Sequence, residues 1–325
     1  MKTSELIKQY LKNKVRATGN ELTDYLQISS RAVRKQLANL LAKDEIDKIG
    51  RPPKVFYFIK KQKIISSEDF SKINKNIRKM IEENFLIITP AGERREGING
   101  FVFWCQKTNQ PVIKTATEYV NTLKKYNAFK KEGFIEGSRK IRATFPKVYL
   151  DKLFYLDFYS IERFGKTKLG QMLLYAKQSQ NKKLIKELIL DVSPSIKQLI
   201  RKYKIDGIGF IPPTVKREVQ LMRELEKNLI FDARKISIIK AKTEVAVPQK
   251  TLNKLADRIE NAKQTIIVDE NKNCKNVLLI DDAVGSGATL NETAGQIKAK
   301  GICKGKIIGL AITGSFKGFD VISEV

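Results

Sequence analysis

The chain has 325 residues and a hydrophobic content of 42%, values typical of a globular protein with two or three domains, but its formal net charge of +27 is strongly basic. It has no histidine and only three widely spaced cysteines, which excludes His-based catalysis, His-ligated metals, a CxxC zinc site and a disulfide framework. No apolar run has the length of a membrane span or of a signal peptide. We therefore expect a cytoplasmic protein that does not contact membranes.

The positive charge favours a polyanionic partner, and nucleic acid is the obvious candidate. Residues 1–65 contain 15 basic and 6 acidic residues, a net charge of +9, so one fifth of the length has one third of the charge. However, the chain has 47 lysines against 15 arginines, a composition that an AT-rich genome also produces. Charge alone therefore leaves DNA binding open.

Residues 3–60 predict a compact helical unit that ends in a hairpin. Apolar side chains recur at helical spacing in three stretches, and serines at the start of the third stretch are good N-caps. A turn rich in Gly and Pro then separates two short apolar runs. The predicted elements are a helix around Leu6–Leu11, a helix opened by Thr18 and Gly19, a helix at Ser29–Ala42, and strands at Ile46–Ile49 and Val55–Ile59.

This arrangement resembles winged helix-turn-helix domains, with Ser29–Ala42 as the recognition helix. Arginine presented on such a helix can reach guanine edges in the major groove, so the resemblance implies binding to double-stranded DNA. A winged helix used for protein contacts and a solvated basic helix are the alternatives. The candidate DNA-binding residues are Ser29, Arg31, Arg34 and Lys35 on the helix, and Arg51 and Lys54 in the wing.

We place a first domain at residues 1–62 and interpret residues 63–145 as a linker and small accessory module of unknown role. Residues 61–82 are polar, and a strand is predicted at Phe85–Thr89. A charged loop, an apolar run at Phe101–Cys105 and a helix at Thr115–Lys131 follow. No chemistry is assigned to this segment.

Residues 146–325 alternate apolar strand-like runs with helical stretches. Such alternation predicts a parallel α/β sheet with flanking helices. The predicted strands are Ile205–Ile211, Ile236–Ile239, Thr265–Val268, Val277–Ile280 and Ile307–Ile312. The predicted helices lie within Leu169–Ile189 and at Ile196–Tyr203, Lys216–Leu229, Pro248–Asn261 and Thr289–Lys300.

The clearest motif follows the strand Val277–Ile280. Asp281 and Asp282 come directly after it, where open α/β sheets bind ligands, and two carboxylates can accept hydrogen bonds from the adjacent hydroxyls of a ribose. The next residues let backbone amides approach an anion at the N-terminus of a helix. This loop consists of Gly285, Ser286, Gly287, Ala288 and Thr289.

The motif resembles the signature of type I phosphoribosyltransferases, although Gly285–Ser286 stands where two threonines are usual. Upstream, Ile208–Arg217 resembles the first core strand and pyrophosphate loop of that fold. The segment Phe164–Asn181 and the spacing of Lys242–Thr243, Pro248–Gln249, Leu252, Arg258 and Asn261 are similar to ComF-like phosphoribosyltransferase proteins. The likeness covers roughly residues 160–315. ComF-like proteins commonly begin with a four-cysteine zinc module, which is absent here.

This resemblance implies a ligand, 5-phosphoribosyl-1-pyrophosphate bound with Mg²⁺, and a role for each matched residue. Asp281 and Asp282 would orient the ribose and contact the metal indirectly, while residues 285–289 would hold the 5′-phosphate. Lys216 and Arg217 would stabilise pyrophosphate, together with Lys240 or Lys242 from a loop. Solvated surface charge is the alternative for Lys216 and Arg217.

Together, the two ends predict a DNA-binding protein with a ligand-binding domain of the phosphoribosyltransferase fold, which would act as a ligand-responsive transcription regulator. A homodimer is one assembly that this prediction leaves open. Two alternatives remain. One is an active phosphoribosyltransferase tethered to nucleic acid, and the other is a ComF-like accessory protein of DNA uptake. No residue identifies an acceptor base.

Overall fold

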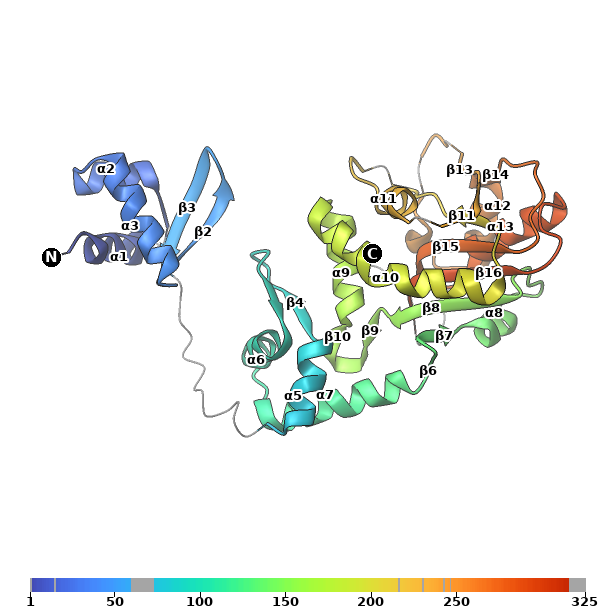
Figure 1. Ribbon diagram of the computed structural model, residues 1–325, viewed down its shortest axis with the longest axis horizontal. Helices are drawn as coiled ribbons and strands as arrows, with labels where there is room; N and C mark the ends of the chain where they lie inside the picture. The colour runs from blue at the N-terminus through green and yellow to red at the C-terminus, as the bar shows by residue number, and fades with distance from the viewer. Residues whose placement is uncertain are drawn as a thin grey trace. The chain divides into compact units, whose positions relative to one another are not determined.

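The computed structural model describes residues 2–14, 16–59, 73–215, 217–229, 231–241, 243–245 and 247–315, apart from the side chains of Arg51 and Lys250. The chain divides into two compact units, Met1–Glu68 and Asp69–Val325, and each is described by itself (Figure 1).

In the first unit, the described residues 2–14 and 16–59 form three helices and a three-stranded antiparallel sheet in the order β1-β3-β2. Its core is one apolar cluster in which the three helices and β2 each bury side chains, including Ile7, Leu22, Leu37 and Ile46. The helices and the hairpin thus lie where the apolar pattern predicts them. Their bounds are α1 Thr3–Lys14, β1 Ala17–Thr18, α2 Gly19–Leu26, α3 Ser30–Ala42, β2 Ile46–Arg51 and β3 Lys54–Ile59.

Local signals in the sequence fix where the helices of this unit begin. The Thr18 side chain accepts a hydrogen bond from the Glu21 amide, and the Glu21 carboxylate accepts one from the Thr18 amide, which makes a capping box for α2. Ser29 caps α3 by accepting from the Ala32 amide at 3.3 Å. As a result, α3 turns Val33, Leu37 and Leu40 into the core and its polar side outward.

The second unit is built on a seven-stranded sheet in the order β12-β11-β15-β16-β8-β7-β6. Neighbouring strands from β12 to β8 are parallel, and the last two strands run antiparallel. The mainly parallel α/β sheet predicted from the sequence is therefore present. The strand bounds are β6 Lys130–Lys131, β7 Phe134–Glu136, β8 Lys152–Phe158, β11 Gly207–Phe210, β12 Arg234–Ile236, β15 Val277–Val284 and β16 Ile307–Gly314.

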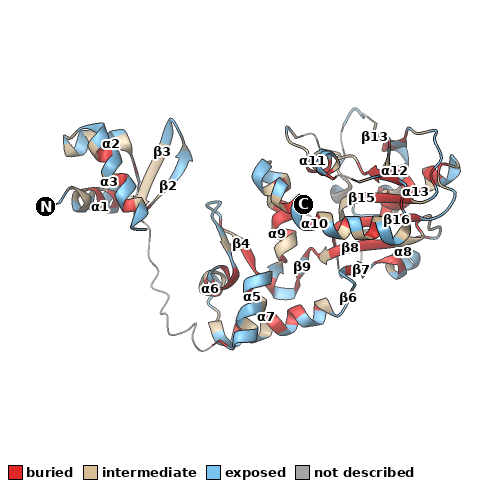
Figure 2. Cartoon of the chain, in the orientation of Figure 1, coloured by how far each residue is buried: buried red, intermediate tan, exposed pale blue. Residues whose placement is uncertain are grey.

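Helices cover both faces of this sheet, because its central strands are apolar on both sides. Leu278 and Ile280 pack into one core cluster with helices α9, α10 and α11, while Val277 and Leu279 pack into another with α13. Figure 2 shows the buried central strands between more exposed helices. The helix bounds are α9 Lys168–Ser179, α10 Lys182–Tyr203, α11 Leu221–Asn228, α12 Leu255–Thr265 and α13 Ala288–Ala299.

The strand β8 was not anticipated, although it lies beside β16 in the middle of the sheet. Two other elements also differ from the prediction. The helix α10 continues through Pro194, where two separate helical stretches were expected. The single strand expected at Ile236–Ile239 is divided between β12, which ends at Ile236, and β13, which runs from Ile238 to Lys240. Strand β13 (Ile238–Lys240) pairs only with β14 (Ile266–Val268), so this hairpin stands apart from the main sheet.

The described part of residues 63–145 belongs to the second unit and supplies β6 and β7 to its sheet. The apolar run Phe101–Cys105 lies within a helix, and an aromatic cluster of Phe85, Phe101 and Tyr119 packs the segment together. Its other elements are α5 Lys75–Asn84, β4 Leu86–Ile88, β5 Arg94–Glu96, α6 Gly97–Lys107, α7 Val112–Asn127 and α8 Ser138–Thr144.

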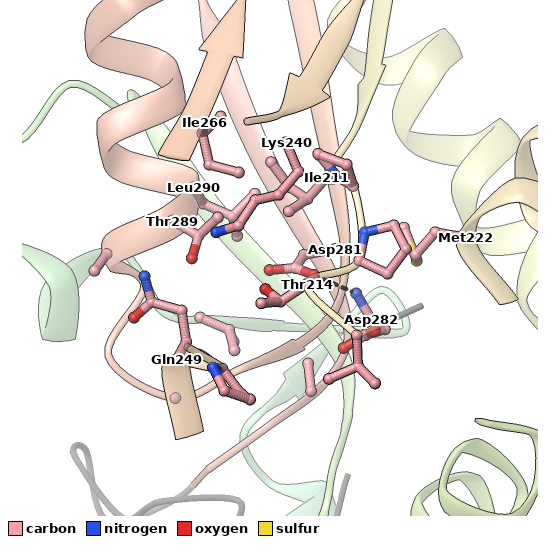
Figure 3. Close-up of a pocket in the computed structure, with 18 of the residues that line it drawn as sticks. Ile211, Thr214, Met222, Lys240, Gln249, Ile266, Asp281, Asp282, Thr289 and Leu290 are labelled. Atoms are coloured by element: carbon pink, nitrogen blue, oxygen red, sulfur yellow. Dashed lines mark hydrogen bonds between the residues drawn. The ribbon is translucent and has the colours of Figure 1, made fainter. Parts of the chain in front are cut away.

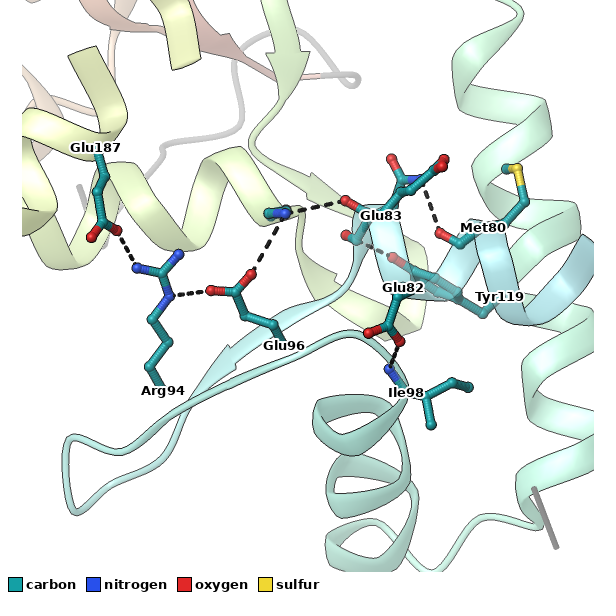
Figure 4. Close-up of polar contacts among 10 residues, drawn as sticks. Met80, Glu82, Glu83, Arg94, Glu96, Ile98, Tyr119 and Glu187 are labelled. Carbon is teal, nitrogen blue, oxygen red and sulfur yellow. Dashed lines mark hydrogen bonds and ion pairs between the residues drawn. The ribbon is translucent and has the colours of Figure 1, made fainter. Parts of the chain in front are cut away.

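Ion pairs attach this segment to the helices that follow. Arg94 on β5 pairs with Glu96 and with Glu187 of α10, and Lys168 at the start of α9 lies 3.7 Å from Glu96 (Figure 4). None of the helices in the described ranges combines the length and the apolar character needed to cross a membrane.

Candidate functional site

A pocket of 210 Å³ lies at the carboxyl ends of β11 and β15 (Figure 3). Four segments line it: the loop after β11, the end of β15 with the loop into α13, the last turn of α9, and the segment from β13 to α12. Parallel strands commonly place ligand sites at this edge of the sheet, because loops and helix N-termini converge there.

Asp281 and Asp282 lie on β15, which extends to Val284, four residues beyond the predicted strand. Both carboxylates line the pocket, and the Asp282 amide donates to Asp281 Oδ1 at 2.8 Å. Burial and the neighbouring carboxylate of Asp282 raise the pKa of Asp281. The pair is thus an acceptor site in which full ionisation of both groups is costly.

Lys177, which sequence reasoning missed, contacts this acid pair. Its Nζ lies 2.7 Å from Asp282 Oδ2, and the two side chains are only 13% and 17% exposed. In the sequence, Lys177 is a single cation directly after the apolar stretch Leu173–Ala176. It also lies within Phe164–Asn181, the segment that resembles ComF-like proteins, and these two features could have drawn attention to it.

The loop from Gly285 to Thr289 forms the adjacent wall of the pocket. Gly287 has φ +86°, and a Cβ at this position would also lie 3.2 Å from Ile141 Cδ1, so the turn into α13 requires glycine. The Ala288 amide donates to Ser286 Oγ at 3.3 Å. The 12-residue helix α13 therefore begins in the pocket wall, with its N-terminal amides and dipole beside the acid pair.

Buried polar contacts fix α13 in this position. Asn291 is fully buried, donates to the Lys147 carbonyl at 3.0 Å and accepts from the Tyr149 amide at 2.8 Å. Gln296 accepts from the Val268 amide at 2.9 Å, which ties the helix to β14. The loop is thus held on two sides by side chains that do not themselves line the pocket.

The loop after β11 brings Arg217 to the pocket, where its side chain is partly exposed. Lys216 and Lys242, two other cations expected at the site, lie outside the described residues. The Val219 amide donates to Gln180 Oε1 at 2.9 Å, so this loop is anchored to the C-terminal end of α9.

Two further cations approach from the segment between β13 and α12. Lys240 projects into the pocket and donates to Thr265 Oγ1, and burial lowers its pKa (Figure 3). Arg258 is 5% exposed, and its Nε donates to the Leu252 carbonyl at 2.7 Å. Burial also lowers the pKa of Arg258, which has no carboxylate partner among the residues that the structure describes.

Arg258 had appeared in the sequence only as part of a spacing, without a role. It stands on the apolar stripe of α12, beside Ile259 and four residues before Ala262. A charged residue on such a stripe can be recognised in the sequence as a candidate for burial and a functional role. Gln249 donates to the Arg258 carbonyl at 3.0 Å and to Asn261 Oδ1 at 3.2 Å, so these three residues form one local network.

The candidate DNA-binding residues lie in the first unit. Arg31, Arg34 and Lys35 are exposed on α3, opposite its buried stripe, and Ser29 caps that helix. Lys54 is exposed at the start of β3, while the side chain of Arg51 lies outside the described residues. Within the described ranges Arg31, Arg34, Lys35 and Lys54 pair with no carboxylate, so the outer side of α3 is a basic surface.

No protein-family model matches the chain, and no curated protein matches it. Among solved structures, the chain is similar to a hypoxanthine-guanine phosphoribosyltransferase (hpt-2) from Bacillus anthracis str. 'Ames Ancestor', with 17% identity and a TM-score of 0.26. That match covers 40% of this chain and 68% of the other. Function is therefore inferred from the pocket and the basic surface themselves.

Proposed function

We propose that the pocket binds a ribose 5-phosphate group, and that its ligand is 5-phosphoribosyl-1-pyrophosphate. One observation carries this proposal: an acid pair, a glycine loop and a helix N-terminus line the same pocket. Carboxylates accept hydrogen bonds from adjacent sugar hydroxyls, and backbone amides at a helix N-terminus bind phosphate. A ribose 5-phosphate group presents an adjacent diol and a phosphate in one ligand.

Each part of the site then has a role. Asp281 and Asp282 accept hydrogen bonds from the ribose, and residues 285–289 hold the 5′-phosphate. Arg217, Lys240 and Arg258 supply the positive charge that a pyrophosphate group needs. Arg258 supports this most strongly, because a buried guanidinium without a carboxylate partner is stabilised by an anionic ligand.

Magnesium would enter with the ligand. The described residues contain no group of three or more His, Cys, Asp or Glu side chains placed to hold a metal ion. The carboxylate oxygens of Asp281 and Asp282 are the type of donor that Mg²⁺ prefers, and phosphate oxygens of the ligand would complete its coordination. When bound, the metal would neutralise charge on the pyrophosphate group.

For the first unit we propose binding to double-stranded DNA in the manner of a winged helix. The helix α3 would enter the major groove with Arg31, Arg34 and Lys35, and the β2–β3 hairpin would approach the phosphates with Arg51 and Lys54. The whole chain would then be a cytoplasmic transcription regulator whose DNA affinity responds to a nucleotide precursor.

Catalysis of phosphoribosyl transfer is the second candidate function. The positive charge of Lys240 and Arg258 favours it, since a leaving pyrophosphate needs charge neutralisation. A ComF-like role in DNA uptake would use the same two activities. Pyrophosphate release in the presence of a panel of nitrogen nucleophiles distinguishes a transferase from a sensor.

The test of the proposed function is titration calorimetry of the full chain with phosphoribosyl pyrophosphate and with ribose 5-phosphate, each with Mg²⁺. We expect saturable binding of both, with tighter binding of the pyrophosphate compound. Glucose 6-phosphate, which offers the same phosphate on a different sugar, serves as the control. Equal affinity for all three compounds would rule out ribose recognition.

A further inference from the structure

The three-stranded sheet of the first unit has two faces of different character. Tyr57 and Ile59 of β3 pack against the apolar cluster formed with the three helices, so they mark the inner face. Side chains alternate along a strand, so Phe56 and Phe58 point to the opposite face. This outer sheet face therefore has two aromatic rings where polar, solvent-facing residues are usual in an antiparallel sheet.

The strand register adds apolar surface beside these rings. Phe56 stands between Thr18 of β1 and Ile49 of β2, its two cross-strand partners. Ile49 is 45% exposed, and β3 is only partly buried from Val55 to Ile59 (Figure 2). The outer sheet face thus has an apolar strip in which ring surfaces remain accessible.

Cations border this strip. Ala17 is buried in the core, so its neighbour Arg16 points to the outer face. The Arg16 guanidinium lies over the Phe56 ring, 5.4 Å from the ring centroid, and remains exposed. Lys54, two residues before Phe56 on β3, is exposed on the same face. Neither cation forms an ion pair with a residue that the structure describes.

Two carboxylates also border the outer sheet face, and both are bonded to the backbone. Asp47 stands opposite Phe58 and accepts from the Lys48 amide at 2.7 Å. Glu21 accepts from the Thr18 amide at 2.6 Å as part of the capping box of α2. Each acid is thus held to the chain beside it, which leaves the two cations to attract a charged partner.

A partner of this face must match both the rings and the positive charge. A second copy of the chain would bring the same cations, and like charges repel. A bilayer needs apolar side chains that insert into it, whereas Phe56 and Phe58 are only partly exposed. A nucleic-acid strand with unpaired bases satisfies both conditions, because its bases stack on aromatic rings and its phosphates attract cations. A duplex keeps its base faces within its own stack.

We propose that the outer sheet face binds single-stranded nucleic acid, with bases stacked on Phe56 and Phe58 and phosphates bound by Arg16 and Lys54. This site is distinct from the duplex site proposed for α3, because the apolar side of α3 packs in the cluster on the inner face. The recognised chemistry, an unpaired base on a phosphate backbone, is common to DNA and RNA.

The experiment measures binding of the full chain to labelled strands of about 12 nucleotides, within the site sizes common for such proteins. The strands are oligo(dT), oligo(U) and an abasic deoxyribose strand, which has the same backbone charge without bases. We expect oligo(dT) to bind about tenfold more tightly than the abasic strand in fluorescence anisotropy, the scale of base–aromatic stacking. Equal affinity for these two strands would overturn the proposal. An equal preference for oligo(U) supports recognition of the base in either nucleic acid, and its absence supports the site with DNA alone.

The rings are tested by Phe56→Leu with Phe58→Leu, which keeps the outer sheet face apolar. This variant should bind oligo(dT) and the abasic strand equally, with its fold checked by circular dichroism. Tyr25→Leu is the matched control, because Tyr25 is a 47% exposed ring on α2 and should leave the preference for bases intact. A preference that survives loss of both rings contradicts the proposal. So does a dimer in sedimentation that only the double variant loses, since the face would then belong to a second copy.

The cation is tested by Arg16→Met against Lys12→Met, which removes the same charge from an exposed position on α1. Arg16→Met should reduce the salt slope for oligo(dT) by about 0.7, the value for one phosphate contact in a single strand. Equal effects of the two variants would remove Arg16 from the site.

The same variants distinguish this site from duplex binding. Phe56→Leu with Phe58→Leu should bind duplex DNA as the wild type does, and Arg31→Ala with Arg34→Ala should keep the preference for oligo(dT) over the abasic strand. If the chain binds no duplex but keeps that preference, the winged-helix proposal fails and the single-strand site stands. The opposite result sinks the single-strand site alone.

Discussion

The basic residues of the two units lie in opposite environments. Arg31, Arg34 and Lys35 on α3 are exposed, whereas Lys177 and Arg258 in the pocket are largely buried. Exposed cations attract a polyanion over roughly a Debye length, about 8 Å at physiological salt, and weaken as salt is added. Buried cations have lost their hydration, so they stabilise an anion mainly when it is in direct contact.

This difference shows that the net charge of +27 does not describe a single property of the chain. The exposed charges suit a long partner whose position can vary, such as a DNA backbone. The buried charges suit a small anion held in one place. Salt should therefore separate the two activities, with a steep dependence for DNA and a shallower one for the pocket ligand.

The largest effect is expected for the pair Asp281→Asn with Asp282→Asn. Each lost charge-assisted hydrogen bond costs about 1.5–3 kcal/mol, so phosphoribosyl pyrophosphate should bind at least about a hundredfold more weakly. Calorimetry measures the loss, and circular dichroism checks the fold.

The direction of this effect is itself informative. Removing two negative charges should strengthen the attraction for an anion if charge alone governed the pocket. Asp191→Asn with Asp232→Asn gives the same charge change at two exposed positions and should leave binding unchanged. If the pocket variant binds as well as this control, the acids do not hold the ribose.

A smaller effect is expected for Arg258→Met. Loss of its contact with the ligand should weaken the binding of phosphoribosyl pyrophosphate about 10- to 100-fold, the range expected for one hydrogen bond to a charged group. The affinity for ribose 5-phosphate should change little, since this compound has no pyrophosphate group. Arg258→Lys retains the charge and should lose less.

The thermal midpoint of the same variant separates a ligand role from a structural one. A buried cation without a carboxylate partner carries an uncompensated desolvation cost, so methionine should leave the ligand-free protein as stable or make it more stable. A large drop in the midpoint would mean that the bond from Arg258 to the Leu252 carbonyl holds the fold.

For the exposed cations, Arg31→Ala with Arg34→Ala should lower affinity for duplex DNA about tenfold, the scale of one good base contact. Each lost phosphate contact should also reduce the salt slope by about one. Lys12→Ala with Lys14→Ala changes the same charge on α1, where both lysines are exposed, and should act more weakly. Equal effects of the two variants in fluorescence anisotropy would argue against α3 as the recognition helix.

An element could be predicted from the sequence where one local pattern was enough to define it. The apolar run Val277–Ile280 predicted β15, at whose carboxyl end the pocket lies, and Ser29 predicted the start of α3. The strand β8 was missed even though Leu153–Leu156 is apolar, because it precedes the first helix of the expected alternation. Its place beside β16 depends on contacts between residues more than 150 apart in sequence.

The cations of the pocket were only partly predictable, for a physical reason. Arg217 follows a recognisable strand, so its place in the pocket wall followed from local order. Lys177 and Arg258 lie on helices whose apolar faces dominate the pattern, and their role depends on what those faces pack against. For Lys177 the contact with Asp282, and for Arg258 the burial without a carboxylate partner, are properties of the folded structure that no local pattern contains.

The last prediction concerns coupling between the two units, and the change in affinity expected for it is the smallest of all. If the chain is a sensor, occupancy of the pocket changes DNA affinity, and DNA changes ligand affinity by the same factor. About 1 kcal/mol of coupling, or roughly fivefold in affinity, is enough to be useful. Fluorescence anisotropy with a labelled duplex, with and without saturating phosphoribosyl pyrophosphate and Mg²⁺, measures it.

The contrast between exposed and buried cations provides the controls for this measurement. The ligand is an anion, so it also competes with DNA for Arg31, Arg34 and Lys35 without any linkage between the units. Pyrophosphate with Mg²⁺ at matched ionic strength reproduces that competition but not the ribose contact. The Asp281→Asn with Asp282→Asn variant keeps the basic surface and should bind DNA while ignoring the ligand. An effect of the ligand that persists at full size in this variant belongs to the surface and not to the ribose site, and the transferase then becomes the better account of the second unit.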